Sequence, residues 1–370
     1  MAEMHLIAVG PLRQAMRTLV RGCGSSEAEA AAVADNLVDA NLAGHDSHGI
    51  GMLPRYVGAL HEGGLKPNAH VRVVLDAGAM LRLDGGSGFG QVVGGEAMQL
   101  GIERARSLGC AIVALGNAHH LGRIGAWAEM AVAAGLVSMH FVNVLARPIV
   151  APHGGAKAGF GTNPFAAGVP LAGRPPMILD FATSTIAQGK TRVAFNKGEP
   201  VPEGCLIDEA GRASTDPRWT VQPPWGALLP FGQHKGSGLA VLCELLGGAL
   251  AAGLVGHREE GQRQRVMNGM LSVIIDPRVL HGGSGWEKAA DDFVTSLLAI
   301  APREGHERVL LAGEPERRTR ALREAQGVPV DATTWRQILD AAASLGLDAA
   351  ALHRSAGLDA STLPPRNASS

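Results

Sequence analysis

The stretch at residues 84–94, DGGSGFGQVVG, joins a run typical of a β-strand to a run typical of a helix. A strand, a glycine-rich turn and a helix in this order are the setting of the dinucleotide fingerprint G-x-G-x-x-G, whose last glycine lets helix and strand approach closely. In this stretch, however, Gln91 or Val93 stands where that last glycine belongs. The fingerprint is therefore absent, and the sequence does not predict a Rossmann fold.

Short strands and helices are predicted on both sides of this turn. The patterns favour strands at residues 71–75 and 79–84 and a helix at residues 91–107. Residues 148–176 carry too much proline and glycine for helices, and residues 196–230 are expected to form a long excursion over the surface. Further strands are predicted at residues 110–115, 136–144, 177–181 and 272–276, with a helix at residues 124–134.

The regions near the two ends of the sequence are predicted to be helical. Ser26 with Glu29 three residues later is a capping box, and apolar residues at helical spacing follow until Gly44. Asp331 is expected to cap the last long helix. The other helices of these regions are predicted at residues 53–60, 317–326 and 331–345.

The composition favours a globular protein that binds small molecules or other protein chains. The 370 residues are 46% hydrophobic, so the chain can bury a sizeable core and is not disordered. The 33 Lys and Arg nearly balance the 34 Asp and Glu, so no global positive field exists to attract nucleic acid or anionic lipid. We therefore expect neither nucleic acid nor a membrane as a partner.

Cysteine spacing and the first residues favour a cytoplasmic protein. The four cysteines form no C-x-x-C pair, which indicates neither a zinc ribbon nor a disulfide framework. The sequence opens without a basic segment followed by an apolar run, so no signal peptide is expected. Residues 236–256 approach the length of a membrane span, but Glu244 at their centre favours a buried helix of a soluble protein.

Several catalytic motifs were tested, and two remain open as alternatives. Gly189-Lys190-Thr191 follows a predicted strand as in a phosphate-binding loop, but Ser184 replaces the first glycine, so nucleotide hydrolysis is a rival function. His45 and His48 lie three residues apart, which keeps a metal-dependent hydrolase open, although H-E-x-x-H is absent. The serine-hydrolase motif G-x-S-x-G fails at Ser87 and Ser284.

Polar residues gather in four glycine-flanked clusters: GHDSHG (44–49), GNAHHLG (116–122), DFATS (180–184) and QHKGSG (233–238). A histidine in such a cluster can carry a proton near neutral pH. We expect Asp46 or Ser47 to cap the helix that holds Tyr56, so that His48 in its first turn has a lowered pKa. A single histidine is nevertheless more often structural, and for Arg55 and Arg123 an exposed helix position is a commoner explanation than carboxylate binding.

These clusters occur in an order that resembles a known enzyme family. GHDSHGIGMLPRYV, NAHHLGRIGAWAE, APHGG with FGTNPFAAGVP, DFATSTIAQGKTRV, HKGSGLA and LAGEPE are similar to motifs of the malate/L-lactate dehydrogenase family that lacks a Rossmann fold. His234, where many members have Trp or Tyr, is typical of its hydroxycarboxylate branch. Several motifs in one order are more specific than any single motif.

The resemblance implies an α/β fold with a large, mainly antiparallel sheet flanked by helices. It also implies a helical lobe at residues 1–70 with 317–358, a catalytic domain that binds NAD at residues 71–316 and a frayed tail at residues 359–370. Members of the family are typically homodimers. The expected activity is NAD(P)-dependent interconversion of 2-oxo and 2-hydroxy acids, with NAD as the cofactor and NADP as an alternative. A catalytically inactive dimer that binds NADH or a metabolite is a further alternative.

The resemblance also implies roles for individual residues. His48 or His120 would transfer the proton, Ser47 and Asp180 would assist, and no metal is expected. The family has an anion contact in an N-T-S-P motif, and here residues 143–148 (NVLARP) shift that contact to Arg147. Substrate binding is thus assigned to Arg55, Arg123 and Arg147. Cofactor binding is assigned to His48, Gly122, Arg123, Ile124, Ile178, Leu179, Asp180, Phe181, Ala182, His234, Lys235, Asn268, Gly313, Glu314, Pro315 and Glu316.

Overall fold

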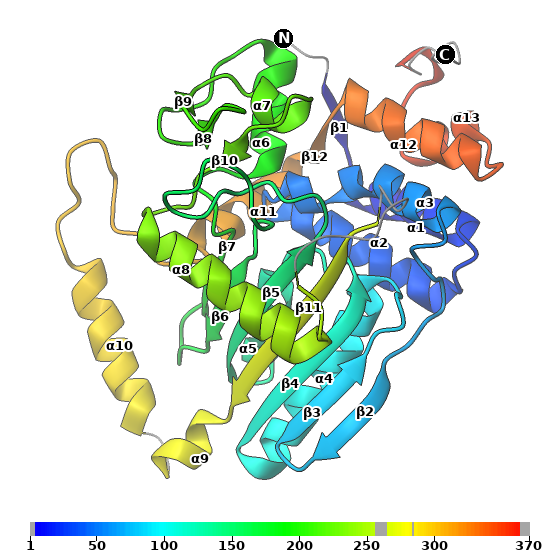
Figure 1. The fold of residues 1–370 in the computed structure, drawn as a ribbon. Coiled ribbons are helices and arrows are strands. Elements are labelled where there is room, and N and C mark those ends of the chain that lie inside the picture. Colours follow the sequence, from blue (N-terminus) through cyan, green and yellow to red (C-terminus); the bar gives the residue numbers. More distant parts are fainter. Residues whose placement is uncertain (1–3, 256–264, 283–284, 363–370) are drawn as a thin grey trace.

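The centre of the molecule is a seven-stranded sheet in the order β2-β3-β4-β11-β5-β6-β7 (Figure 1). The computed structural model describes residues 4–255, 265–282 and 285–362. In this sheet β3 and β4 are parallel and the other five strand pairs are antiparallel. The predicted mainly antiparallel sheet is therefore confirmed. Its strands are β2 (Arg72–Ala77), β3 (Met80–Asp84), β4 (Cys110–His119), β5 (Val137–Leu145), β6 (Phe165–Val169), β7 (Met177–Phe181) and β11 (Met267–Ile275).

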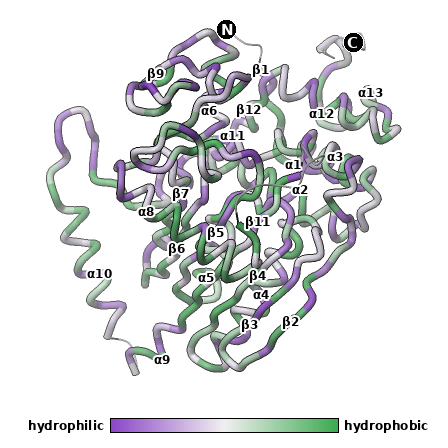
Figure 2. The backbone as a smooth tube through the Cα atoms, viewed as in Figure 1, coloured by the Kyte–Doolittle hydropathy of each residue, from purple (hydrophilic) through white to green (hydrophobic). Residues whose placement is uncertain are grey.

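Helices cover both faces of this sheet. On one face α4 (Gly90–Leu108) packs against β4, where alternate residues Ala111, Val113 and Leu115 are buried, and α5 (Gly125–Ala133) packs against β6. The opposite face carries α8 (His234–Cys243), which continues as a π-helix, η3 (Glu244–Leu250) (Figure 1). Figure 2 shows a hydrophobic region at the central strands, where β11 is buried along most of its length, whereas β2 at one edge of the sheet is exposed throughout.

The helix at residues 236–254 differs from the prediction of one buried helix. Its inner side contacts the sheet, and the Glu244 carboxylate accepts a hydrogen bond from Asn163 Nδ2 at 2.7 Å. Its outer side is exposed, with Leu242, Leu245 and Leu250 each about half accessible or more. The prediction was wrong because high apolar content does not say which side of a helix is covered. Within the described part of the chain, no helix has the length and apolar character needed to cross a membrane.

The regions near the two ends of the sequence share one apolar core. Strand β1 (Met4–Ile7) pairs antiparallel with β12 (Val328–Asp331), and α1 (Val9–Gly22) packs on α2 (Glu27–Leu42) and α13 (Ala349–Ser355). The core also contains residues of α3 (Leu53–His61), α12 (Ala332–Ser344) and Phe89 from the sheet region. The division into a helical lobe and a catalytic domain stays a prediction.

The predicted helix caps can be checked bond by bond. Ser26 Oγ accepts a hydrogen bond from Glu29 N at 3.2 Å, but the Glu29 carboxylate turns to Asn68 N at 2.8 Å, so only half of the capping box forms. Asp331 caps α12 as predicted, because its carboxylate accepts from Thr334 N at 2.9 Å.

The predicted tail at residues 359–370 lies partly outside the described residues, since nothing is described beyond Thr362. Its first residues are ordered: Ala360–Thr362 form a 3-10 turn, and His353 Nε2 contacts Asp359 O at 2.9 Å. The buried His353 thus contacts the first residues of this tail, and the frayed tail itself stays a prediction.

Residues 196–230 form more structure than the predicted surface excursion. After α6 (Gln188–Lys197), a three-stranded sheet forms from β8 (Leu206–Ile207), β9 (Ala213–Ser214) and β10 (Ala227–Leu228), with the short α7 (Arg218–Val221) beside it. Leu206, Trp219 and Leu228 belong to a small apolar core of their own. Two-residue strands are too short for periodicity to reveal. The remaining helices are α9 (Pro277–His281), α10 (Gly285–Leu298) and α11 (Glu314–Gln326).

Candidate active site

His48 lies in a short 3-10 turn, Asp46–His48, that several side chains hold in place. Arg323 donates to both carboxylate oxygens of Asp46, at 2.6 and 3.0 Å, and Asn41 Nδ2 donates to one of them at 2.6 Å. Asn41 Oδ1 also accepts from Ile50 N at 2.9 Å, just beyond the turn. A Cβ on Gly49 would lie 2.1 Å from Asn41 Oδ1, so a side chain here would displace Asn41. The turn thus has a fixed geometry.

The predicted cap of the Tyr56 helix does not form. Helix α3 begins after Met52 without a side-chain cap, and Asp46 and Ser47 lie in the separate turn before it. Ser47 Oγ instead lies 3.0 Å from His48 Nδ1. The prediction was wrong because the DSHG residues form a 3-10 turn of their own and a second 3-10 turn, Ile50–Met52, separates them from α3; helical periodicity does not reveal such turns.

The structure brings the two predicted histidines together. Their rings stack with centroids 5.6 Å apart and planes 14° from parallel. His120 is buried at the end of β4, whereas His48 is half-buried. The pair therefore has one enclosed ring and one ring with an accessible edge.

Both imidazoles are neutral at pH 7. Burial, opposed by the Asp180 carboxylate, lowers the pKa of His48 to about 4. Burial and the neighbouring His48 ring hold the pKa of His120 well below its usual value. The neutral state of His48 was expected, but the cause is burial rather than a helix N-terminus.

The backbone next to His120 is fixed by Asn268 on β11. Asn268 Oδ1 accepts from Leu121 N at 2.8 Å, and Asn268 Nδ2 donates to Asn143 O at 2.8 Å. Each end of this buried amide thus already has a protein partner. Asn268 is therefore placed to hold the segment after His120.

A cavity of about 180 Å³ is lined in part by Arg123, Asp180 and Glu316. Arg123 and Asp180, which line it, both act on the His48 charge, and its Glu316 lies 3.5 Å from His45 Nε2. Ile178 N also donates to Ala312 O at 3.2 Å, which brings β7 beside the start of α11. The lining residues are Ala43, Arg123, Glu129, Pro176, Ile178, Asp180, Gly313, Glu316, Arg317 and Arg320, five of which were predicted to bind a cofactor.

Two buried polar atoms at this cavity have unused hydrogen-bonding capacity. Asp180 Oδ2 and Arg123 Nη1 are 3.7 Å apart, which is an ion pair but too long for a hydrogen bond. Among the described residues, neither atom has a hydrogen-bond partner. Buried polar atoms of this kind are normally satisfied, so the pair is suited to a polar ligand.

Residues 7–339 match the family model described as malate/L-lactate dehydrogenase. The chain belongs to the malate/L-lactate dehydrogenase family. It is 47% identical over 349 residues to hydroxycarboxylate dehydrogenase B of Escherichia coli, covering 94% of this chain and 96% of that protein. It is 35% identical over 328 residues to L-sulfolactate dehydrogenase of Methanocaldococcus jannaschii, covering 88% and 93%.

Solved structures of the family have the same fold. An E. coli chain described as a candidate malate/lactate dehydrogenase matches with a TM-score of 0.90 at 46% identity, over 95% of this chain and 99% of that chain. The sulfolactate dehydrogenase of M. jannaschii matches with a TM-score of 0.83 at 32% identity, over 93% and 98%. The non-Rossmann fold expected from the sequence is thereby confirmed.

The other residues assigned from the family resemblance lie in different surroundings. Gly122, Ile124 and Phe181 lie close along the chain to His120, Arg123 and Asp180, and Gly122 has a φ of 73° that favours glycine. Arg147 contacts Thr220 O at 3.3 Å and stacks on Trp225, with its guanidinium carbon 3.7 Å from the ring centroid.

The last assigned residues lie in the same segments or at the start of α8. Arg55 acts electrostatically on Tyr56 and His120. Leu179 and Ala182 lie beside Asp180, and Glu314 and Pro315 open α11, where Glu314 accepts from Leu311 N at 3.1 Å. His234, followed by the exposed Lys235, begins α8 and lies edge-on to His153 with ring centroids 6.0 Å apart.

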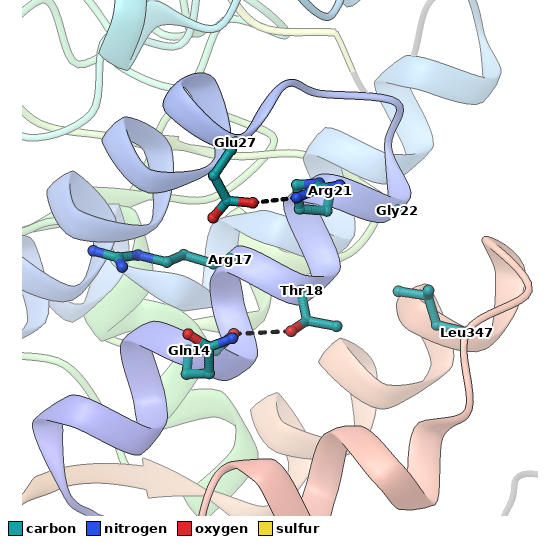
Figure 3. Close-up of a pocket in the computed structure, with 7 residues that line it drawn as sticks. All are labelled: Gln14, Arg17, Thr18, Arg21, Gly22, Glu27 and Leu347. Carbon is teal, nitrogen blue, oxygen red and sulfur yellow. Dashed lines mark hydrogen bonds and ion pairs between the residues drawn. The ribbon is translucent and has the colours of Figure 1, made fainter.

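A larger cavity of about 410 Å³ lies elsewhere, on the surface of the helices near the two ends of the sequence (Figure 3). Its two arginines are already paired, Arg17 with Asp35 at 2.9 Å and Arg21 with Glu27. It contains none of the predicted site residues, so the smaller cavity, whose Arg123 and Asp180 act electrostatically on His48, is the candidate active site.

Sequence reasoning missed several residues of this site. Tyr56, which contacts His120 Nδ1 at 2.6 Å, was used only to mark a helix, and Gln91, which donates to Tyr56, was noted only for breaking a motif. Arg317 and Arg320 line the cavity but were not predicted. The signal available for the two arginines was their spacing of three on the helix that follows Gly313.

The two rival motifs take other roles in the structure. Thr191, the last residue of the possible phosphate loop, is buried; its hydroxyl donates to Gln188 O and accepts from Thr220 Oγ1, each at 2.8 Å. Gly189 packs against Ser47, where a Cβ would lie 2.7 Å from the serine Cβ. Among residues 4–255, 265–282 and 285–362, no group of three metal-ligating side chains gathers.

Proposed function

We propose that the protein is an NAD(P)-dependent oxidoreductase that interconverts 2-oxo acids and 2-hydroxy acids. The observation that carries this proposal is the stacked histidine pair together with a cavity lined by residues of three separate family motifs, of which Arg123 and Asp180 act electrostatically on His48. The named relatives are a hydroxycarboxylate dehydrogenase and an L-sulfolactate dehydrogenase, and sulfolactate is a 2-hydroxy acid. NAD is proposed as the cofactor, with NADP as the alternative.

The residues at the cavity suit a nicotinamide. A carboxamide has one acceptor and two donors, and Asp180 Oδ2 and Arg123 Nη1 are a buried acceptor and a buried donor without hydrogen bonds among the described residues. Ile178 supplies an apolar wall of the cavity, and at Gly313 only the backbone lines it. When bound, a nicotinamide supplies the hydride transfer. We propose that Arg123, Ile178, Asp180, Gly313 and Glu316 hold it, together with the neighbouring residues assigned above.

The protein's own residues supply the proton and bind the acid group. His120 is proposed to exchange a proton with the substrate oxygen through Nε2, because its Nδ1 is engaged by Tyr56. His48, oriented by Ser47, lies parallel to it and is the second candidate. Arg55 or Arg123 is proposed to bind the substrate carboxylate, since a guanidinium can bind a carboxylate through two parallel hydrogen bonds, in a bidentate geometry. Arg147 is the weaker candidate for binding this carboxylate, because its guanidinium already contacts Thr220 and Trp225.

Separate replacement of His48 and His120 by Asn tests the assignment. A general acid or base contributes roughly 10²- to 10⁴-fold to kcat, so at least one variant should lose this much activity in the reduction of 2-oxo acids with NADH. His306→Asn, an identical change at an exposed position, is the matched control. Full turnover in both variants would contradict the proposal. Binding of NADH without oxidation by the unmodified protein would instead favour an inactive binding protein.

We also propose that the protein is a homodimer of the cytoplasm. The outer side of α8 and η3 exposes Val241, Leu242, Leu245 and Leu250, and apolar patches of this kind commonly bind a second chain. The four cysteines are unpaired, as is usual in a reducing compartment. Light scattering should report a dimer for the unmodified protein and a monomer for Leu242→Glu/Leu245→Glu. Leu322→Glu, at another exposed leucine, is the control, and a dimer in the double variant would exclude this face.

A further inference from the structure

Tyr56, the single tyrosine of the chain, lies between His120 and Gln91. Its hydroxyl oxygen is 2.6 Å from His120 Nδ1 and accepts a hydrogen bond from Gln91 Nε2 at 2.8 Å. Tyr56 is fully buried, and Gln91 and His120 are nearly so. Burial raises the pKa of Tyr56, so the phenol keeps its proton. The three side chains thus form a short hydrogen-bonded chain that ends at the proposed proton carrier.

The position of Gln91 relative to His120 is fixed by the backbone. Gln91 is the second residue of α4, and the first, Gly90, lies against the end of β4: a Cβ there would be 2.2 Å from His120 O and 2.4 Å from His119 O. Glycine at this point lets the helix approach the strand that carries the histidine. The residue that breaks the dinucleotide fingerprint is therefore held beside the active site.

Hydrogen-bond accounting links the Gln91 amide to the tautomer of His120. The phenol has one proton to donate. If His120 Nδ1 is bare, Tyr56 donates to it and Gln91 Nε2 donates to Tyr56. If Nδ1 carries a proton, Tyr56 accepts that proton's hydrogen bond and must donate its own to Gln91 Oε1. Among the described residues, Gln91 Oε1 is buried and has no partner, so it is free to take this second role when the amide turns over.

We propose that Gln91 and Tyr56 are positioning residues that set which nitrogen of His120 carries the proton. This inference rests on the proposed function. In the oxidation of a 2-hydroxy acid, a bound nicotinamide would supply the acceptor for the hydride from carbon 2. The hydroxyl proton moves to His120 Nε2, which must be bare. The proton on Nδ1 then stays hydrogen-bonded to Tyr56, and the phenol proton to Gln91 Oε1. Reduction runs through the same arrangement in reverse.

Variants that keep the shape of the side chains test this proposal. Tyr56→Phe and Gln91→Met should each lower kcat for 2-hydroxy acid oxidation by about 10- to 100-fold, a part of the ~10²- to 10⁴-fold that acid–base catalysis supplies, with little change in KM. Gln99→Met is the matched control, because Gln99 is exposed two turns further along α4. Unchanged kcat in both variants would overturn the proposal.

The pH dependence provides a readout that a purely structural role would not change. The charged and titratable groups that act on His120 are His48, His119 and Arg55, with Tyr56 in direct contact. Gln91→Glu keeps the acceptor for the phenol proton and adds a negative charge, so the acid limb of the kcat profile should move to higher pH. Gln99→Glu should leave that limb in place. An unshifted profile in Gln91→Glu would contradict the proposed chain.

A double-mutant cycle separates this inference from the proposed function. In a His120→Asn background, Tyr56→Phe should cause no further loss, because the phenol acts through His120. If the double variant instead loses as much kcat as the two single losses multiplied together, the inference is overturned while the proposed function stays intact. Full activity of His120→Asn would instead contradict the assignment of His120 itself. Thermal melting and NADH binding check that each variant folds. If Tyr56→Phe does not fold, the two Gln91 variants provide the test.

Discussion

Acid should destabilise the protein through a histidine that lies outside the proposed site. His140 on β5 is fully buried, with Nδ1 2.8 Å from Ser272 Oγ and Nε2 2.9 Å from Ser138 Oγ. Burial lowers the pKa of His140 to about 3, so the ring is neutral in the folded protein. In the unfolded chain its pKa returns to about 6.5.

The magnitude follows from the difference between these two pKa values. Between pH 6.5 and pH 3 the unfolded chain binds a proton at His140 that the folded protein does not, so stability falls as the pH falls through this window. Each pH unit well inside the window costs about 1.4 kcal/mol. Lowering the pH from 7.5 to 5 should therefore remove about 2 kcal/mol of unfolding free energy through His140 alone.

Urea denaturation of the unmodified protein and of His140→Gln at both pH values isolates this contribution. Other buried histidines titrate in both proteins and cancel in the comparison. His140→Gln should be less stable at pH 7.5, but its loss of unfolding free energy on going to pH 5 should be smaller by about 2 kcal/mol. His306→Gln, at an exposed position, should follow the unmodified protein. Equal losses in His140→Gln and the unmodified protein would refute the reasoning.

Three further predictions concern single contacts. Asp331→Ala should lower the unfolding free energy by about 1 kcal/mol in denaturant titrations, because it removes the cap of α12, whereas the exposed Asp340→Ala should change it little. Arg323→Met should lower kcat about 10-fold or more with melting nearly unchanged, since it releases the turn that carries His48. Gly125→Ala should raise the KM for NADH about 10-fold, because its Cβ would lie 2.4 Å from Arg123 Nη1 and overpacking costs about 1–3 kcal/mol. A normal KM in that variant would argue against the cavity as the cofactor site.

The fold was predictable where periodicity and motif order are strong. Six of the seven strands of the large sheet and the Asp331 cap follow from local patterns, and the sheet type follows from the family resemblance. Strand β6 was missed because it lies in the proline- and glycine-rich residues 148–176. The strand pairing of β1 with β12 was not predictable, because it joins residues far apart in the sequence through backbone hydrogen bonds. The outer side of α8 was misjudged because apolar content alone does not reveal which side of a helix is covered.

The site was predictable as a set of residues but not as a geometry. The clusters indicated two histidines, and the structure stacks them. The turn before Gly49 depends on Asn41 and Arg323, which lie outside the quoted motifs. The sequence therefore predicted that Asp46 or Ser47 caps the Tyr56 helix, and this cap does not form. The link from Gln91 through Tyr56 to His120 crosses three elements, and no local pattern can show a hydrogen bond across such a distance in sequence.

The antiparallel pair of β1 and β12 has a consequence for synthesis of the protein. The core around α1 and α2 is closed by Val328, Trp335 and Leu352, which leave the ribosome long after the DSHG turn has been made. A nascent chain can complete the large sheet first, but the support for His48 must await these late residues, Arg323 among them. Translation that stops early would therefore yield polypeptides without a competent active centre, and enzymatic turnover would begin only when the last helices have docked.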